Sequence, residues 1–200
     1  GRYEIERVIG AGGMGLVLKG FDAELHRPVA IKVLAPHLAH SAAARKRFAR
    51  EAQATAAVIH PHVIPIHNVE SGDKLPYLVM SYINGSSLQW YVDTNGPLTV
   101  EETLRIAMQT AAGMRAAHEQ GLIHRDVKPA NVLVRRDGIA KLTDYGIAHL
   151  VRPMHGERAP SPQELAPGTG AYMSPEQAEG LPIDRRSDVW AVGVCLFELV

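Results

Sequence analysis

The octet His124–Asn131, H-R-D-V-K-P-A-N, limits what this 200-residue chain can be more than any other stretch. It holds Asp126, with a lysine two residues on and an asparagine five residues on. The aspartate can accept a proton from a hydroxyl group, Lys128 can neutralise a phosphate, and Asn131 can hold a magnesium ion. Together these groups can move a phosphoryl group onto an alcohol. A polar loop after a helix would explain the octet alone, so the rest of such a site must lie elsewhere in the chain.

A glycine-rich segment, Gly10–Val17, has the pattern G-x-G-x-x-G-x-V. Its glycines would let backbone N–H groups approach a phosphate without obstruction by a Cβ atom: Gly10, Gly12 and Gly15. A dinucleotide-binding turn has the same glycines, but it needs a helix that starts at the last of them. Here a strand-like run at 16–19 follows, then a polar turn and a second strand at 29–34. A hairpin whose glycine loop folds over a ligand fits better.

Two further segments add charged groups at the ends of predicted strands. Val29–Lys32 reads V-A-I-K, with its lysine at the end of an apolar run. Asp144–Gly146 reads D-Y-G and follows two short strand-like runs, which are joined through Asp137-Gly138. Because Asp-Gly strongly favours a tight hairpin turn, this hairpin would carry Asp144 to a position beside Asn131.

In this order and at these spacings, the segments resemble the catalytic domain of eukaryotic-type serine/threonine protein kinases, and especially its bacterial subgroup. The resemblance covers essentially the whole chain. Residues 168–176 resemble the end of an activation segment, with Ser-Pro-Glu in place of Ala-Pro-Glu. Residues 184–193 resemble the start of the buried helix under the catalytic loop, where Asp188 would accept hydrogen bonds from the backbone near His124 and Arg125.

The resemblance implies an α+β, bilobal, protein kinase-like fold. Residues 1–84 would form a small β-rich N-lobe with one helix at 41–60, and residues 85–200 a mainly helical, incomplete C-lobe. A helix should open with a capping box between Thr99 and Glu102. Its apolar positions recur at Leu104, Met108, Ala111 and Ala112. Since the chain stops at Val200, inside a predicted helix, we expect the domain to continue and these residues alone to fold poorly.

The resemblance also gives roles in transfer from ATP to a protein Ser or Thr hydroxyl. Asp126 would orient the hydroxyl and accept its proton, and Lys128 would offset charge on the moving phosphoryl group. Asn131 and Asp144 would hold Mg²⁺, with Mn²⁺ as an alternative. Thr169 would hydrogen-bond Asp126 and Lys128.

ATP itself would lie between the two lobes. Lys32 would contact the α- and β-phosphates and pair with Glu51, the only acidic residue of the 41–60 helix. The hinge would hydrogen-bond adenine through backbone groups, with Met80 at the back of the pocket. The remaining contacts implied for the nucleotide come from the hinge and from apolar residues above and below the base: Tyr82, Ile83, Val17, Ala30 and Leu133.

Four positions depart from the family pattern or leave regulation open. Tyr145 replaces the usual Phe and adds a hydroxyl that needs a partner if it is buried. Ala130 and Ser87 stand where arginine-directed relatives carry Glu, which predicts a weak preference for arginine upstream of the acceptor. Ser161 is the only hydroxyl residue between 147 and 168. It is either a phosphorylation site that pairs with Arg125 or an unmodified linker residue.

Composition argues against several other classes. With 21 basic and 21 acidic side chains, the chain has no basic excess that would favour nucleic acid. The single cysteine, Cys195, lies in an apolar run and should be a buried, inert thiol. The longest apolar run, Val189–Phe197, is too short to span a bilayer. The ten histidines lack the pairings of a zinc site.

Two alternative functions remain. A pseudokinase would need a broken catalytic position, and none of the five expected ones is broken. A small-molecule kinase would normally lack Lys128 and the 168–176 segment. The resemblance further implies a cytoplasmic domain whose membrane tether, if any, lies outside this stretch, and it allows self-association for trans-autophosphorylation.

Overall fold

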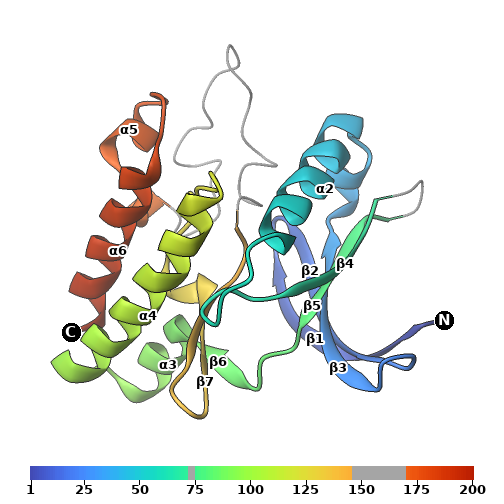
Figure 1. Cartoon of the computed structure of the whole chain (residues 1–200), viewed down its shortest axis with the longest axis horizontal. Coiled ribbons are helices and arrows are strands. Elements are labelled where there is room, and N and C mark those ends of the chain that lie inside the picture. Colours follow the sequence, from blue (N-terminus) through green and yellow to red (C-terminus); the bar gives the residue numbers. More distant parts are fainter. Residues whose placement is uncertain (72–74, 146–169) are drawn as a thin grey trace.

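The computed structural model describes residues 1–71, 75–145 and 170–200. A β-rich part that contains the N-terminus lies at one end of the molecule, and a helical part that contains the C-terminus lies at the other (Figure 1). The expected α+β class is therefore confirmed. Among the described residues, no helix combines the length and the apolar character needed to cross a membrane.

The β-rich part is a five-stranded antiparallel sheet with the spatial order β1-β2-β3-β5-β4. The strands are β1 (Tyr3–Gly12), β2 (Gly15–Asp22), β3 (Arg27–Leu34), β4 (Ile66–Glu70) and β5 (Tyr77–Ser81). A strand, not a helix, follows the glycines, so the preference for a hairpin over a dinucleotide-binding turn is confirmed. Leu34, Leu78 and Met80 turn to the face that meets the helix α2.

Two helices follow β3: α1 (Pro36–Ala39) and α2 (Ala42–Ala56). The Ser41 hydroxyl caps α2 by accepting a hydrogen bond from the Ala44 N–H (3.3 Å). The helix packs on the sheet through Phe48 and Ala52 (Figure 1). It ends four residues before the predicted His60, because the chain turns there to bring Val58 into the core of the helical part.

The helical part consists of α3 (Leu88–Asn95), α4 (Val100–Glu119), the short α5 (Pro175–Ala178) and α6 (Arg185–Leu199). The capping box between Thr99 and Glu102 is confirmed. The predicted apolar face of α4 is wrong, since Leu104 and Met108 are 55% and 73% exposed. The buried side carries Thr103, Ile106, Thr110, Gly113, Met114 and Ala117 instead.

A small sheet, β6-β7-β8, lies between the two parts, with strands β6 (Gly85–Ser87), β7 (Val132–Arg135) and β8 (Ala140–Leu142). The predicted hairpin of β7 and β8 is confirmed, with Gly138 at a φ of +81° in its turn. The octet closes in a 3-10 turn at Pro129–Asn131, immediately before β7. A second 3-10 turn covers Gly170–Tyr172.

Cys195 is buried in the core of the helical part, as predicted. Burial raises the pKa of its thiol to about 12. At pH 8 only about one thiol in ten thousand would then be thiolate, the form that reacts with alkylating agents. We expect no labelling by iodoacetamide at pH 8 in native protein and full labelling in urea, followed by mass spectrometry. Rapid native labelling would show that α6 opens easily.

Candidate active site

The three side chains singled out in the octet lie together. The Lys128 Nζ is 3.1 Å from the Asp126 Oδ2. The Asn131 side-chain amide donates to both the Asp126 backbone oxygen (2.7 Å) and its Oδ2 (3.0 Å). These contacts fix the Asp126 carboxylate, and they commit the amide N–H groups of Asn131, so that its Oδ1 is the atom left for a metal ion.

The loop is held from below by one buried carboxylate, that of Asp188 in the first turn of α6. It accepts hydrogen bonds from the backbone N–H of His124 (2.8 Å) and of Arg125 (2.7 Å). The expectation for Asp188 is thus confirmed. Arg125 has a φ of +69°, a left-handed backbone that a non-glycine residue rarely adopts. The two hydrogen bonds stabilise that turn and aim the next residue, Asp126, away from the core.

Two partners of the loop were missed in the sequence. The His118 Nε2 lies 2.7 Å from the Asp188 Oδ2, and the Gln177 amide donates to the Arg125 backbone oxygen (3.0 Å). Both come from other helices, α4 and α5. The signals in the sequence were positional: His118 lies six residues before His124, and Gln177 lies one residue after Ser-Pro-Glu.

His124 links the loop to the strand that carries Asp144. Its ring is fully buried; Nδ1 accepts from the Asp126 N–H (3.3 Å), so Nε2 carries the hydrogen and donates to the Thr143 oxygen (2.9 Å). The His124 ring therefore contacts the backbone of Asp126 in the octet and the backbone of Thr143, the residue before Asp144.

The predicted ion pair between Lys32 and Glu51 is wrong for this structure. The Lys32 Nζ pairs with the Asp144 Oδ1 at 2.8 Å, and the Glu51 Oε1 lies 3.3 Å from the Arg50 Nη2. Among the described residues, Lys32 and Glu51 form no ion pair. The physical reason is competition, because Asp144 at the end of the β7–β8 hairpin offers Lys32 a nearer carboxylate, while Arg50 occupies that of Glu51.

Tyr145 is almost fully buried, and its ring packs on His124 with 4.4 Å between the centroids. Its hydroxyl finds the partner that burial demands, the backbone oxygen of Gly113 in α4 (3.4 Å). Burial raises the pKa of the phenol, so the group stays protonated and donates.

We therefore expect Tyr145→Phe to weaken the attachment of the D-Y-G segment to α4 modestly, by about 1 kcal/mol, the usual net value of a neutral hydrogen bond. Denaturant unfolding should show this loss, while the affinity for nucleotide changes by less than about threefold. An increase in stability would mean that the 3.4 Å hydrogen bond contributes less free energy than the burial of the Tyr145 hydroxyl costs.

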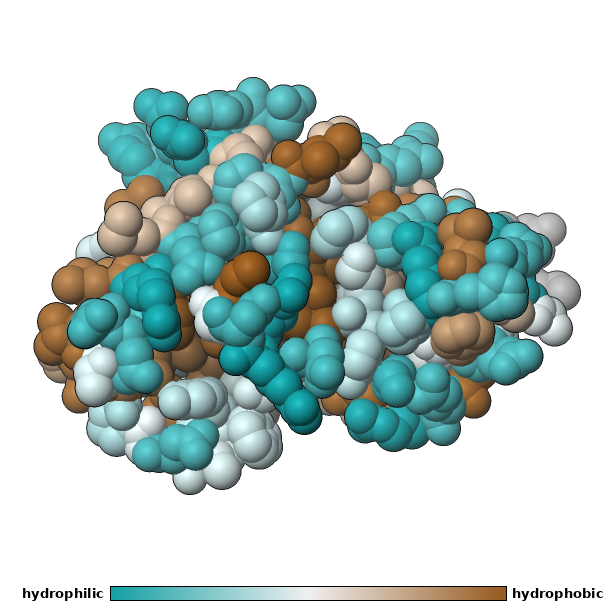
Figure 2. Space-filling view, turned by 60° about the horizontal axis from the view of Figure 1, so that its bottom comes forward, coloured by the Kyte–Doolittle hydropathy of each residue, from teal (hydrophilic) through white to brown (hydrophobic). Residues whose placement is uncertain are grey.

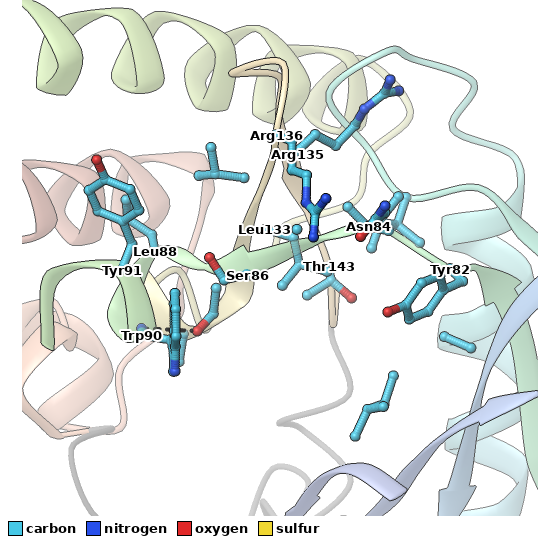
Figure 3. Close-up of a pocket in the computed structure, with 18 of the residues that line it drawn as sticks. Tyr82, Asn84, Ser86, Leu88, Trp90, Tyr91, Leu133, Arg135, Arg136 and Thr143 are labelled. Atoms are coloured by element: carbon cyan, nitrogen blue, oxygen red, sulfur yellow. Dashed lines mark hydrogen bonds between the residues drawn. The ribbon is translucent and has the colours of Figure 1, made fainter. Parts of the chain in front are cut away.

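A hollow of about 1120 Å³ runs between the two parts of the molecule. Its lining includes most residues predicted to contact the nucleotide: Gly10, Val17, Ala30, Met80, Tyr82, Ile83, Leu133 and Asp144. Leu133, Thr143 and Tyr82 lie in a row along it (Figure 3). The lining of this end is mostly apolar, as a planar base requires, and the carboxylate of Asp144 lies at its inner edge.

The glycine loop borders the hollow, and its turn, Gly13-Met14, joins β1 to β2. Gly15 has a φ of +137°, and a Cβ there would lie 1.8 Å from the Val33 oxygen, so only glycine fits. The Met14 oxygen accepts from the Ala35 N–H (2.9 Å), which fixes the loop to the end of β3. Gly12 has open space around it.

Some predicted residues lie outside the described ranges, namely Thr169 and Ser161. Glu176 is described, and its carboxylate accepts a hydrogen bond from the Ser187 hydroxyl, which lowers its pKa. No group of three or more His, Cys, Asp or Glu side chains that could hold a metal ion occurs in the described ranges.

Comparison with known proteins agrees with this arrangement. The family model of the protein kinase domain matches residues 3–200. Serine/threonine-protein kinase PknB of Mycobacterium leprae is 38% identical over 203 residues, which cover 100% of this chain and 32% of the relative. Serine/threonine-protein kinase PrkC of Bacillus subtilis is 40% identical, with 100% and 30% covered. The chain thus spans about a third of the length of these relatives.

Solved structures show the same fold. The crystal structure of the Mycobacterium tuberculosis PknI kinase domain superposes with a TM-score of 0.78 at 31% identity, over 99% of this chain and 73% of that one. The sequence match, the shared fold and the geometry of the octet lead to one conclusion: the chain belongs to the protein kinase domain family, and the relatives that it resembles are bacterial serine/threonine-protein kinases.

Proposed function

We propose that this chain is the catalytic part of a protein that transfers the γ-phosphate of ATP to Ser or Thr hydroxyls of proteins. The observation that carries the proposal is the set of contacts among Asp126, Lys128 and Asn131, held over Asp188. It provides a fixed carboxylate, a cation 3.1 Å away and an amide oxygen on one short loop.

In this proposal Asp126 orients the acceptor hydroxyl and takes its proton, while Lys128 offsets charge on the phosphoryl oxygens. Thr169 would help to hold the acceptor. Lys32, which pairs with Asp144 in this structure, would also contact the α- and β-phosphates. Glu51 would pair with Lys32 only after its carboxylate leaves Arg50.

The donor set at the site suits a magnesium ion. Asn131 and Asp144 supply oxygen atoms, and Mg²⁺ in such sites takes one or two protein oxygens together with phosphates and water. These two residues would hold Mg²⁺, or Mn²⁺ in its place, and the ion would neutralise charge on the ATP phosphates.

The nucleotide would enter the hollow with its base between Val17, Ala30 and Leu133 and its edge on the backbone of Tyr82 and Ile83. Met80 would close the back of the pocket. Gly10, Gly12 and Gly15 would cover the phosphates. The lobes would divide at residue 84, because β5 ends at Ser81 and β6 begins at Gly85.

The test is phosphate transfer by the full-length protein from radiolabelled Mg-ATP to itself and to a general Ser/Thr protein substrate. Phosphoamino-acid analysis should find label on Ser or Thr. Dilution would show whether self-labelling occurs in trans, between associated copies. Stabilisation by ATP without any phosphate transfer would contradict the proposed enzymatic activity and favour a nucleotide-binding module.

A peptide library should show weak selection for arginine upstream of the acceptor residue, since Ser87 and Ala130 offer no carboxylate.

A further inference from the structure

The side chain of Gln177 is buried, although it is polar and belongs to α5, a helix of only four residues. Hydrophilic side chains cover much of the molecular face in Figure 2, whereas only 7% of Gln177 is exposed. The helix α5 lies at the end of the helical part where α6 begins (Figure 1). Burial of an amide costs free energy unless its oxygen and its NH₂ group both find partners, so each half needs an explanation.

The oxygen of the Gln177 amide belongs to the cap of α5. It accepts hydrogen bonds from the Ser174 N–H (3.1 Å) and hydroxyl (3.3 Å), and the Ser174 hydroxyl accepts in turn from the Gln177 N–H (3.4 Å). This is a capping box, in which glutamate serves at the third helical position as well as glutamine does. The cap therefore explains the length of the side chain and its oxygen, but it does not explain the NH₂ group.

The NH₂ group of the same amide reaches the catalytic octet. The Gln177 Nε2 donates to the Arg125 backbone oxygen (3.0 Å). At the other edge of that peptide unit, the Asp126 N–H donates to the His124 Nδ1 (3.3 Å). Because a peptide unit is planar, contacts on its two edges fix its tilt, and with it the direction in which the Asp126 side chain leaves the backbone.

The position of this contact explains why the chain has an amide there. Arg125 has a φ of +69°, a conformation that persists only where its surroundings hold it. Asp188 holds the N–H groups of this turn from α6, and Gln177 holds its oxygen from α5. A glutamate of the same length could serve the cap, but it would turn an acceptor oxygen toward the Arg125 oxygen. Only the amide makes both contacts at once.

We propose that Gln177 is a positioning residue for phosphate transfer, through which the end of the 168–176 segment sets the orientation of the Asp126 carboxylate. The inference rests on the proposed function, in which Asp126 takes the proton of the acceptor hydroxyl. In that function Thr169 helps to hold the acceptor, and its segment ends on the Ser174 cap. Gln177 joins this cap to the peptide unit before Asp126, so one amide links the acceptor side of the site to the group that takes the proton.

The test is Gln177→Glu in the full-length protein, with initial rates of phosphate transfer measured over a range of ATP concentrations. The glutamate keeps the oxygen that caps Ser174 and replaces the N–H group that binds the Arg125 oxygen. We expect kcat to fall roughly ten- to a hundredfold, the scale on which a small displacement of a catalytic group lowers a rate. The KM for ATP should stay within about threefold. A role in the cap alone predicts the wild-type kcat.

Gln109→Glu in α4 is the matched control. The Gln109 amide also bridges two backbone groups, because it donates to the Gly138 oxygen (3.2 Å) and accepts from the Ala140 N–H (2.9 Å) at the β7–β8 turn. The same substitution there loses the same kind of hydrogen bond, so the stability should fall by a similar amount while kcat stays at the wild-type value. Gln177→Met, which carries no charge, replaces Gln177→Glu if that variant fails to fold, and its kcat should also fall.

Hydrogen exchange of the peptide that spans residues 122–133, read by mass spectrometry, tests the inference without any transfer. We expect faster exchange in Gln177→Glu than in the wild type or in Gln109→Glu. A wild-type kcat in Gln177→Glu, an equal fall of kcat in Gln109→Glu, a change confined to the KM for ATP, or unchanged exchange would overturn the inference. If the wild type transfers no phosphate but the exchange still depends on Gln177, the proposed function fails and the contact between Gln177 and the loop stands.

Discussion

Asp126→Asn should reduce phosphate transfer by about 10²–10⁴-fold, the contribution of a positioned general base. The amide keeps the shape of the carboxylate but cannot accept a proton, and it removes the negative charge 3.1 Å from Lys128. Nucleotide affinity should stay within about threefold, since Asp126 does not line the hollow that we propose holds the base. Initial rates of transfer and titration with a fluorescent nucleotide measure the two effects separately.

The matched control for that substitution is Asp93→Asn, an identical change of charge on the exposed surface of α3. It should leave both quantities unchanged. If Asp126→Asn keeps more than a tenth of the rate, another group takes the proton. If it loses nucleotide affinity as well, the octet contributes to binding rather than to the transfer step.

The parts of the site that the sequence predicts correctly depend on short-range geometry. Asp126, Lys128 and Asn131 lie within six residues, so one turn brings them together. The β7–β8 hairpin follows from Asp137-Gly138 for the same reason. Asp188 was placed under the loop by resemblance, and the two N–H groups of the left-handed turn at Arg125 explain why a carboxylate is needed there.

The parts that were wrong depend on choices between distant partners. Lys32 has two carboxylates available, Glu51 and Asp144, and only the placement of α2 on the sheet decides between them. The face of α4 was misjudged because apolar periodicity ignores close backbone contact. A Cβ on Gly113 would lie 2.7 Å from the His62 oxygen, so the helix turns the face that carries this glycine inward and leaves Leu104 and Met108 outside.

Asp188→Ala should be the most destabilising single substitution, at about 3–5 kcal/mol, because it removes the acceptor of a buried network. Asp188 is 1% exposed and serves the N–H groups of His124 and Arg125 as well as the ring of His118. Without it, these two N–H groups lose their acceptor, and the left-handed turn at Arg125 keeps the hydrogen bond from Gln177 but loses its support from α6. Denaturant unfolding measures the loss.

Asp188→Ala should also lower the rate of phosphate transfer in the protein that remains folded. Below the unfolding temperature, Asp188→Ala should lower kcat, because the turn that aims Asp126 relaxes, while nucleotide affinity should stay unchanged, because the proposed nucleotide contacts of Lys32 and the hinge lie elsewhere. Asp184→Ala is the control on the same helix, since it removes an exposed N-cap that accepts from the Arg186 N–H (2.8 Å), together with its exposed ion pair to Arg186, and costs about 1 kcal/mol. If both variants lose the same stability and keep the same kcat, Asp188 is an ordinary helix-terminal charge. A fall in kcat confined to Asp188→Ala would identify it as the residue through which α6 positions the catalytic loop.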